Sequence, residues 1–209
     1  DMEVQLDEIV TYLEANGIAS VCDDGIEADD RIGQLAKRAE EEGYDVAIAS
    51  SDKDFFQLIN DRVKMLNPAD KSGEPMDADA VEAKTGVRPH QIVDWLSLVG
   101  DAADNIPGVP GIGVKTAASL LNEFGSVDGI YERLVEVKRD KQRESLAIFE
   151  SNVRRNQKLV ALKFNLPMEP ELDSLRKGFE DTNKLNKLYK KWGFKTSLTN
   201  FKKSNNKYK

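Results

Sequence analysis

The sequence predicts an α/β fold in which a parallel central sheet is followed by an all-helical subdomain. Two observations predict this class. Short apolar runs alternate with amphipathic helical segments over the first 75 residues, and the strand signal disappears from Asp77 onward. With 209 residues and 40% hydrophobic content, the chain is long enough to bury a substantial core in one domain or two small ones.

The first part of the chain alternates between predicted helix and predicted strand. Apolar residues recur at helical spacing over residues 2–13, and the apolar run 18–22 reads as a strand. An amphipathic helix over 27–42 leads to a second strand at 46–49, and a third strand is predicted at 63–66. Continuous apolar strands joined by a crossover helix are typical of a parallel sheet that is buried on both faces.

The later part reads as helices that Gly and Pro separate. We predict these helices over residues 77–85, 89–99, 114–124, 126–135 and 138–163. The chain is therefore predicted to have three parts, which are a sheet domain over 1–75, a helical subdomain over 76–181 and a lysine-rich tail over 182–209.

Composition restricts the kind of site and the compartment. With one cysteine, Cys22, and one histidine, His90, the chain offers neither an internal disulfide nor a zinc site of the usual nitrogen and sulfur type. Any metal ion is therefore expected to be held by oxygen. No apolar run approaches the roughly 18 residues that span a bilayer, and no signal-peptide pattern opens the chain. We expect a cytoplasmic protein without a membrane partner.

The net charge of −7 is unevenly distributed along the chain. No acidic residue follows Asp181, whereas nine lysines do, so an acidic body carries a basic tail. A tail of this kind can contact nucleic acid or can serve only to keep the chain end in solution, and charge alone leaves both readings open.

Seven carboxylates lie in three short clusters. The segment "GIEADD" (25–30) joins a predicted strand to a helix, "SSDKD" (50–54) leaves the carboxyl end of the next strand, and "GDAAD" (100–104) opens a later loop. Ligands of open α/β sheets bind outside the carboxyl ends of the strands, so the first two clusters are expected at one sheet edge. The candidate metal ligands are Glu27, Asp29, Asp30, Asp52, Asp54, Asp101 and Asp104.

Each cluster alone has a simpler explanation, because acids in the first turn of a helix gain about 0.3–1 kcal/mol from the helix dipole. Their joint placement favours metal binding. Crowded carboxylates repel one another unless a cation neutralises them, and carboxylate oxygens suit Mg²⁺ or Mn²⁺. Seven ligands suit two ions, and two ions about 3.5–4 Å apart promote phosphoryl chemistry without a protein nucleophile.

The loop "PGVPGIGVKTA" has the composition of an anion site. Gly111 and Gly113 stand directly before a predicted helix, where the first backbone N–H groups are free to hold a phosphate, and Lys115 adds a positive charge. The alternative is an ordinary connection between two helices with glycines chosen for close packing. The spacing differs from that of a Walker A loop.

Taken together, the segments "GIEADDRIGQLA", "SSDKDFFQLI" and "VDWLSLVGDAADNIPGVPGIGVKTAASLLNEFGS" resemble the 5′ nuclease family. This family includes the 5′→3′ exonuclease domain of bacterial DNA polymerase I, phage 5′ exonucleases and the flap endonucleases. The resemblance implies a PIN-like sheet domain, of which residues 1–75 would be the carboxyl-terminal part, and a helix-hairpin-helix (H3TH) subdomain. It also implies hydrolysis of DNA at flaps, nicks and branches, including removal of RNA primers, in replication and repair.

The resemblance also implies roles for individual residues. Glu27, Asp29 and Asp30 match ligands of a first Mg²⁺ or Mn²⁺ ion, and Asp54, Asp101 and Asp104 match the group around a second. Asp52 falls between the two, and Asp52, Asp101 and Asp104 are the expected catalytic residues. The expected DNA contacts are Gly111, Gly113, Val114, Lys115 and Thr116. The expected ligands of a potassium ion are the backbone carbonyls of Gly108, Val109 and Ile112.

Two further classes of function stay open at this point. Members of the family begin with a strand that ends in Asp and an arch with Lys and Arg, which are not found upstream of residue 1. We expect that this segment lies on a longer chain or is supplied by a second chain. Without it, the chain could be a catalytically weak DNA-binding module. A small-molecule phosphotransfer or phosphatase domain would gather acids in a similar way.

Overall fold

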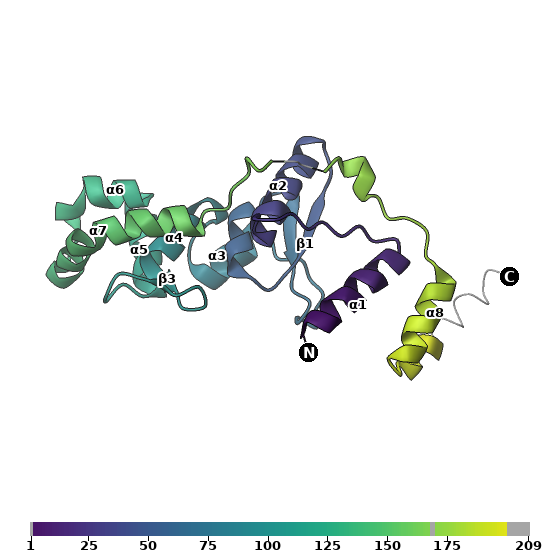
Figure 1. The fold of residues 1–209 in the computed structure, drawn as a ribbon. Coiled ribbons are helices and arrows are strands. Elements are labelled where there is room, and N and C mark those ends of the chain that lie inside the picture. The colour runs from purple at the N-terminus through teal and green to yellow at the C-terminus, as the bar shows by residue number, and fades with distance from the viewer. Residues whose placement is uncertain (1, 168–169, 200–209) are drawn as a thin grey trace. The chain divides into compact units, whose positions relative to one another are not determined.

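The computed structural model describes residues 2–167 and 170–199, with the side chains of 2–4 excepted. The chain divides into two compact units, one formed by residues 26–167 and the other by 1–25 together with 168–209 (Figure 1). The described helices of unit one, residues 26–167, are α2 (Ala28–Glu41), η1 (Lys53–Leu58), α3 (Ala78–Thr85), η2 (Pro89–Gln91), α4 (Ile92–Val99), α5 (Val114–Phe124), α6 (Val127–Glu132), η3 (Leu134–Glu136) and α7 (Asp140–Val160). Its strands are β1 (Val46–Ala49), β2 (Val63–Leu66), β3 (Gly100–Asp101) and β4 (Ile106–Pro107).

The parallel sheet is small and consists of β1 and β2. Their register runs from Val46 opposite Val63 to Ala49 opposite Leu66. The predicted strands at 46–49 and 63–66 are confirmed, and η1 lies between them in the sequence. The carboxyl end of β1 leads directly into the segment that carries Asp52 and Asp54, so the sheet positions this acidic cluster.

The predicted strand at residues 18–22 is wrong. These residues are irregular, and Ile18 and Val21 are exposed. A strand is stable only when its backbone groups pair with a neighbour, and among the described residues the 18–22 segment has no ladder partner. The apolar run alone was therefore not sufficient to form a strand.

The helical part agrees closely with its prediction because its boundaries are set by local signals. Helix α3 begins where the Asp77 carboxylate accepts the N–H of Ala80 at 2.9 Å and ends at Gly86, which adopts the left-handed conformation at φ 84°. Helix α5 covers the predicted range 114–124 and ends before Gly125. Helix α6 follows at once, with the Ser126 hydroxyl as its cap.

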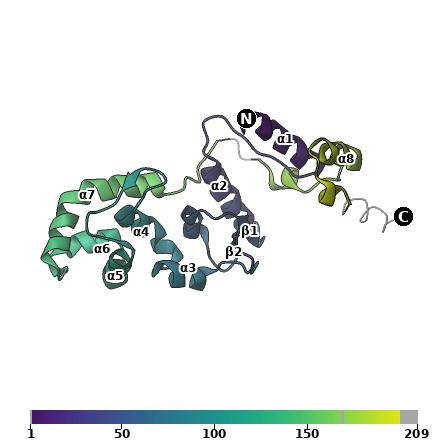
Figure 2. The ribbon, with the colours of Figure 1, turned by 90° about the horizontal axis from the view of Figure 1, so that it is seen from below.

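One hydrophobic core extends from α2 through the sheet to α7. Helix α4 packs against both α5 and α7 (Figures 1 and 2), and its Ile92, Leu96 and Leu98 side chains are fully buried. Leu121 of α5 and Leu146 of α7 belong to the same core. Residues on either side of the predicted division at residue 75 share this core, and that division stays a prediction.

The second unit contains α1 (Met2–Ala15), η4 (Leu172–Leu175) and α8 (Thr182–Lys191). Ala15 packs against Leu185 and Leu188 of α8, and Tyr12 lies against Tyr189. The predicted lysine-rich tail thus begins as a helix, and its residues 200–209 lie outside the described part of the chain. Within 2–167 and 170–199, no helix has the length and apolar character needed to cross a membrane.

Candidate metal centre and nucleic-acid interface

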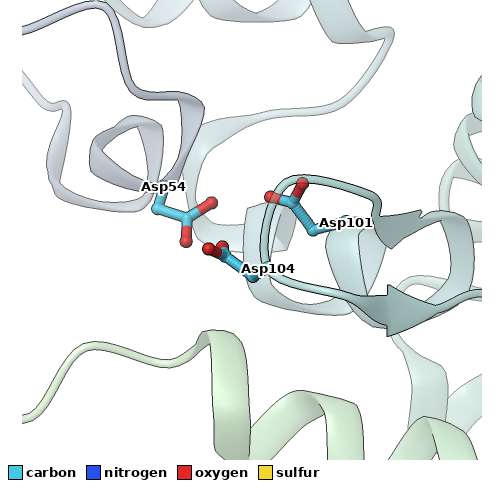
Figure 3. Close-up of side chains that lie close together, drawn as sticks. All are labelled: Asp54, Asp101 and Asp104. Atoms are coloured by element: carbon cyan, nitrogen blue, oxygen red, sulfur yellow. The ribbon is translucent and has the colours of Figure 1, made fainter.

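Three carboxylates converge in the unit formed by residues 26–167. One carboxylate oxygen from each of Asp54, Asp101 and Asp104 lies within 4.8 Å of the other two (Figure 3). Asp54 comes from η1, Asp101 from β3, and Asp104 from the loop between β3 and β4. Segments almost 50 residues apart therefore bring three predicted ligands to one point.

The position of Asp54 follows from the local structure after β1. The Asp52 carboxylate accepts the N–H of Asp54 at 3.0 Å and so caps η1. Phe55 and Phe56 are buried in the core at 2% and 1% exposure, which fixes η1 against the rest of the unit. Strands β3 and β4 pair in an antiparallel hairpin, and the Asp54 side chain lies at the edge of the anchored turn, toward Asp101 and Asp104 of this hairpin (Figure 3).

The hairpin that carries Asp101 and Asp104 depends on close backbone packing. Gly100 has φ 79°, and a Cβ atom on Gly108 would lie 2.1 Å from the carbonyl oxygen of Val99. Only glycine fits at Gly108 without moving the backbone. Asn156 of α7, which is 1% exposed, donates from Nδ2 to the carbonyl oxygens of Ser97 and Pro107 at 3.1 and 2.8 Å. This amide thereby ties the last turn of α4 to β4, on the far side of the hairpin.

The electrostatics of the cluster favour a bound cation. Burial, followed by the neighbouring charges of Asp52 and Asp101, raises the pKa of Asp54 to about 6. Its Oδ1 atom is buried and has no hydrogen-bond partner among the described residues. A buried carboxylate oxygen without a donor, next to two further carboxylates, is a suitable donor set for Mg²⁺ or Mn²⁺. The residues present therefore fit such an ion.

Asp101 has a partner that the sequence analysis missed. Lys53 donates from Nζ to Asp101 Oδ2 at 2.5 Å, and the N–H of Ala103 donates to Oδ1 at 3.0 Å. Burial alone would raise the pKa of Asp101, but the Lys53 ammonium and then the Ala103 N–H outweigh it, so this pKa lies below its ordinary value. The lysine between two aspartates in "SSDKD" was the available signal.

Only part of the first predicted cluster, residues 25–30, faces the region of Asp54, Asp101 and Asp104. Burial raises the pKa of Asp29, and the charges of Asp52, Asp30, Glu27 and Asp104 raise it further, so Asp29 faces this acidic region. Glu27 is exposed at the start of α2 and Asp52 is exposed after β1.

Asp30 has other partners in this structure. Its Oδ1 accepts the backbone N–H of Lys163 at 2.9 Å, and its Oδ2 lies 3.9 Å from Lys163 Nζ. The structure therefore groups Asp54, Asp101 and Asp104 closely, with Asp29 and Asp52 nearby, whereas Asp30 is engaged by Lys163, which follows the carboxyl end of α7.

The glycine loop presents an open helix end. Gly113 is the N-terminal cap of α5, and a Cβ on either Gly111 or Gly113 would meet nothing within 4 Å. Lys115 and Thr116 of the first turn line a hollow of about 290 Å³ together with Lys138 and Arg139. Lys138 is paired with Glu123 of the same hollow at 3.6 Å, and a helix N-terminus with Lys115 and Arg139 nearby is suited to a phosphate group.

The three predicted potassium ligands lie just before this helix end. The side chains of Val109 and Ile112 are buried, and the N–H of Ile112 donates to the carbonyl oxygen of Val109 at 3.0 Å. The carbonyl oxygen of Val109 thus already accepts one hydrogen bond within the loop. Gly108 lies against Gly100, so the hairpin that carries Asp101 and Asp104 leads directly into this loop.

Two family models match the chain. The 5′-3′ exonuclease N-terminal resolvase-like domain matches residues 1–86, and the 5′-3′ exonuclease C-terminal SAM fold matches residues 87–200. A DNA polymerase I of Bacillus caldotenax is 42% identical over 176 residues, which make up 82% of this chain and 20% of the relative. The chain thus spans about a fifth of the length of that relative.

Solved structures of a phage enzyme have a similar fold. The T5 5′-exonuclease with bound zinc is 25% identical with a TM-score of 0.67, over 91% of this chain and 70% of that one. A bacteriophage T5 D15 flap endonuclease, solved as a pseudo-enzyme-product complex with DNA and metal ions, is 28% identical with a TM-score of 0.60. That match covers 66% of this chain and 50% of the T5 chain.

Proposed function

The chain belongs to the 5′-3′ exonuclease family, and we propose that it hydrolyses DNA phosphodiesters as a structure-specific 5′ nuclease. The proposed substrates are duplexes with a 5′ flap, a nick or a branch, and the proposed role is removal of flaps and RNA primers in replication and repair. The observation that carries this proposal is the convergence of Asp54, Asp101 and Asp104 beside the turn that leads into the α5 N-terminus.

Two divalent ions, Mg²⁺ or Mn²⁺, are the proposed cofactors. Asp54, Asp101 and Asp104 would hold one ion, and Asp29 with Glu27 would hold the other, with Asp52 between them. When bound, such ions lower the pKa of water and neutralise charge on the phosphoryl group. Asp30 is a ligand in this proposal only if it leaves Lys163, to which it is bound in this structure.

The chain's own residues would hold and orient the duplex. Lys115 and the free N–H groups at the start of α5 would bind one phosphate of the DNA backbone, and Thr116 would add a hydroxyl donor. Gly111, Gly113 and Val114 would let the backbone approach closely. The carbonyls of Gly108, Val109 and Ile112 would hold a potassium ion at this point. Because the hairpin joins this grip to the carboxylates, the distance between the held phosphate and the cleaved bond would be fixed.

Cleavage of a duplex with a labelled 5′ flap tests the proposal. We expect product with Mg²⁺ and none with EDTA, and we expect the double variant Asp101→Asn, Asp104→Asn to lose activity in Mg²⁺. Asp61→Asn is the matched control, because Asp61 is an exposed carboxylate before β2, at the opposite edge of the sheet from the cluster. Equal product in all of these reactions would reject the proposal.

A DNA-binding function without cleavage is the second candidate. The engagement of Asp30 by Lys163 favours it, because this carboxylate is not free to complete a metal site in the structure. This function predicts duplex binding that weakens as salt rises, since phosphate contacts release counterions, together with no product under any metal condition.

A further inference from the structure

The Lys53 side chain already provides a positive charge to the proposed metal site. Lys53 Nζ lies 2.5 Å from Asp101 Oδ2, and the Asp101 side chain is only 5% exposed. The second oxygen, Oδ1, accepts the N–H of Ala103 at 3.0 Å. Both oxygens of this carboxylate are therefore occupied by donors from the chain itself.

We propose that Lys53 is a positioning residue that acts as a built-in placeholder for a divalent ion. In the metal-free protein its ammonium group neutralises Asp101, and it must leave Oδ2 when an ion binds among Asp54, Asp101 and Asp104. This inference rests on the proposed function for the metal site itself. It adds that Lys53 competes with the ion and so sets the affinity of the site.

The charges of the cluster give Lys53 this role. Three carboxylates that each place one oxygen within 4.8 Å of the others repel one another, and one lysine offsets part of this repulsion in the folded, metal-free chain. The same ammonium repels an arriving cation and occupies one of its ligand atoms. An ion can therefore bind with full coordination by Asp101 Oδ2 only after the lysine has moved.

The geometry also allows the lysine to move without disturbing the fold. The Lys53 side chain is 37% exposed, so its flexible stem can carry the ammonium group into water. The backbone of η1 stays anchored, because Phe55 and Phe56 are buried in the core directly after it. Release of Asp101 thus requires a rotamer change and no backbone motion.

Calorimetric titration of the full chain with Mn²⁺ tests this proposal. For Lys53→Met we expect Mn²⁺ to bind about tenfold more tightly, equivalent to about 1.4 kcal/mol, because the competing ammonium is gone. Lys53→Arg keeps the charge and should retain the weaker binding of the unaltered chain. Lys64→Met is the matched control, because it makes the same change in net charge at a residue of β2. The Mn²⁺ affinity of Lys64→Met should equal that of the unaltered chain.

Thermal unfolding supplies a second measurement that does not involve cleavage. Without metal, Lys53→Met should unfold at a lower temperature than the unaltered chain, because the carboxylates lose their counter-charge. With saturating Mn²⁺ this difference should disappear. A lysine that served only as a surface ion pair would give the same difference in both conditions.

The outcomes separate this inference from the proposed nuclease activity. Tighter Mn²⁺ binding by Lys53→Met in a chain that cleaves no DNA supports the placeholder and rejects the nuclease. Unchanged or weaker Mn²⁺ binding by Lys53→Met in a chain that does cleave overturns the placeholder alone. Absence of Mn²⁺ binding in both the variant and the unaltered chain overturns the placeholder as well.

Discussion

Replacing Asp54 with Asn should stabilise the metal-free protein in a way that depends on pH. The pKa of Asp54 is raised from its ordinary 3.8 to about 6, first by burial and then by Asp52 and Asp101. Because one pKa unit corresponds to 1.36 kcal/mol, this shift makes the ionised Asp54 cost about 3 kcal/mol of folding free energy. An asparagine of nearly the same shape cannot ionise and avoids this cost.

The sign of the effect follows from the two pKa values. Below about pH 4 the carboxyl group is protonated in both the folded and the unfolded chain, so it adds no penalty. Between about pH 4 and pH 6 the unfolded chain loses this proton first, and the folded state loses stability. Above pH 6 the penalty is complete. Asp54→Asn should therefore gain about 2–3 kcal/mol near pH 7.5 and little near pH 4.

Urea unfolding in EDTA, followed by circular dichroism at pH 4.5, 6.0 and 7.5, measures this gain. Asp61→Asn, which removes an exposed carboxylate, should show no comparable pH dependence. An equal gain for Asp54→Asn at all three pH values would refute the reasoning, because a packing effect does not follow protonation. A loss of stability at pH 7.5 would refute it as well.

Three further substitutions test the parts that surround the cluster. Asn156→Ala removes the hydrogen bonds to Ser97 of α4 and Pro107 of β4 and should lower the free energy of unfolding by about 2–4 kcal/mol in urea titrations; an unchanged free energy of unfolding would show that Asn156 does not hold these segments together. Gly108→Ala should separate the two sides of the hairpin, since its Cβ would meet a carbonyl oxygen at 2.1 Å, and should weaken Mn²⁺ binding in calorimetry; unchanged affinity would contradict this. Lys115→Ala should reduce the slope of the logarithm of the duplex-binding constant against the logarithm of salt concentration by about one unit, measured by fluorescence anisotropy. The substitution Lys141→Ala, at an exposed lysine, should change this slope less. Equal changes for both variants would reject a contact between Lys115 and a DNA phosphate.

The helical half could be predicted because its boundaries are encoded locally. Gly113 and Gly125 flank α5, and the helix ends within one residue of each. A glycine that adopts a left-handed or extended conformation is a signal within the segment itself, so it needs no information about distant contacts.

Strand formation depends on partners that a local pattern does not show. The runs at 46–49 and 63–66 became β1 and β2 because each pairs with the other. The run at 18–22 looked similar in the sequence but has no partner within the described residues and is irregular. Apolar character alone was thus an incomplete predictor.

For the site, the sequence indicated which carboxylates to consider but not which would meet. From the order of the strands we expected only the acids of 25–30 and 50–54 to share a sheet edge, whereas the grouping of Asp54 with Asp101 and Asp104, which do lie together, was implied by the family resemblance. The pairing of Asp30 with Lys163, and that of Lys53 with Asp101, join residues far apart in the sequence. Such pairs depend on tertiary packing. The roles assigned to the individual site residues stay predictions.

The proposed site requires that Asp54, Asp101 and Asp104 together bind a divalent ion. Anomalous diffraction from crystals of the full chain grown with Mn²⁺ tests it most directly. We expect a strong Mn²⁺ peak at about 2.0–2.3 Å from a carboxylate oxygen of each of the three residues, with Lys53 Nζ displaced from Asp101. A peak that lies elsewhere, or the absence of any peak at this cluster in crystals that hold Mn²⁺, would contradict the account.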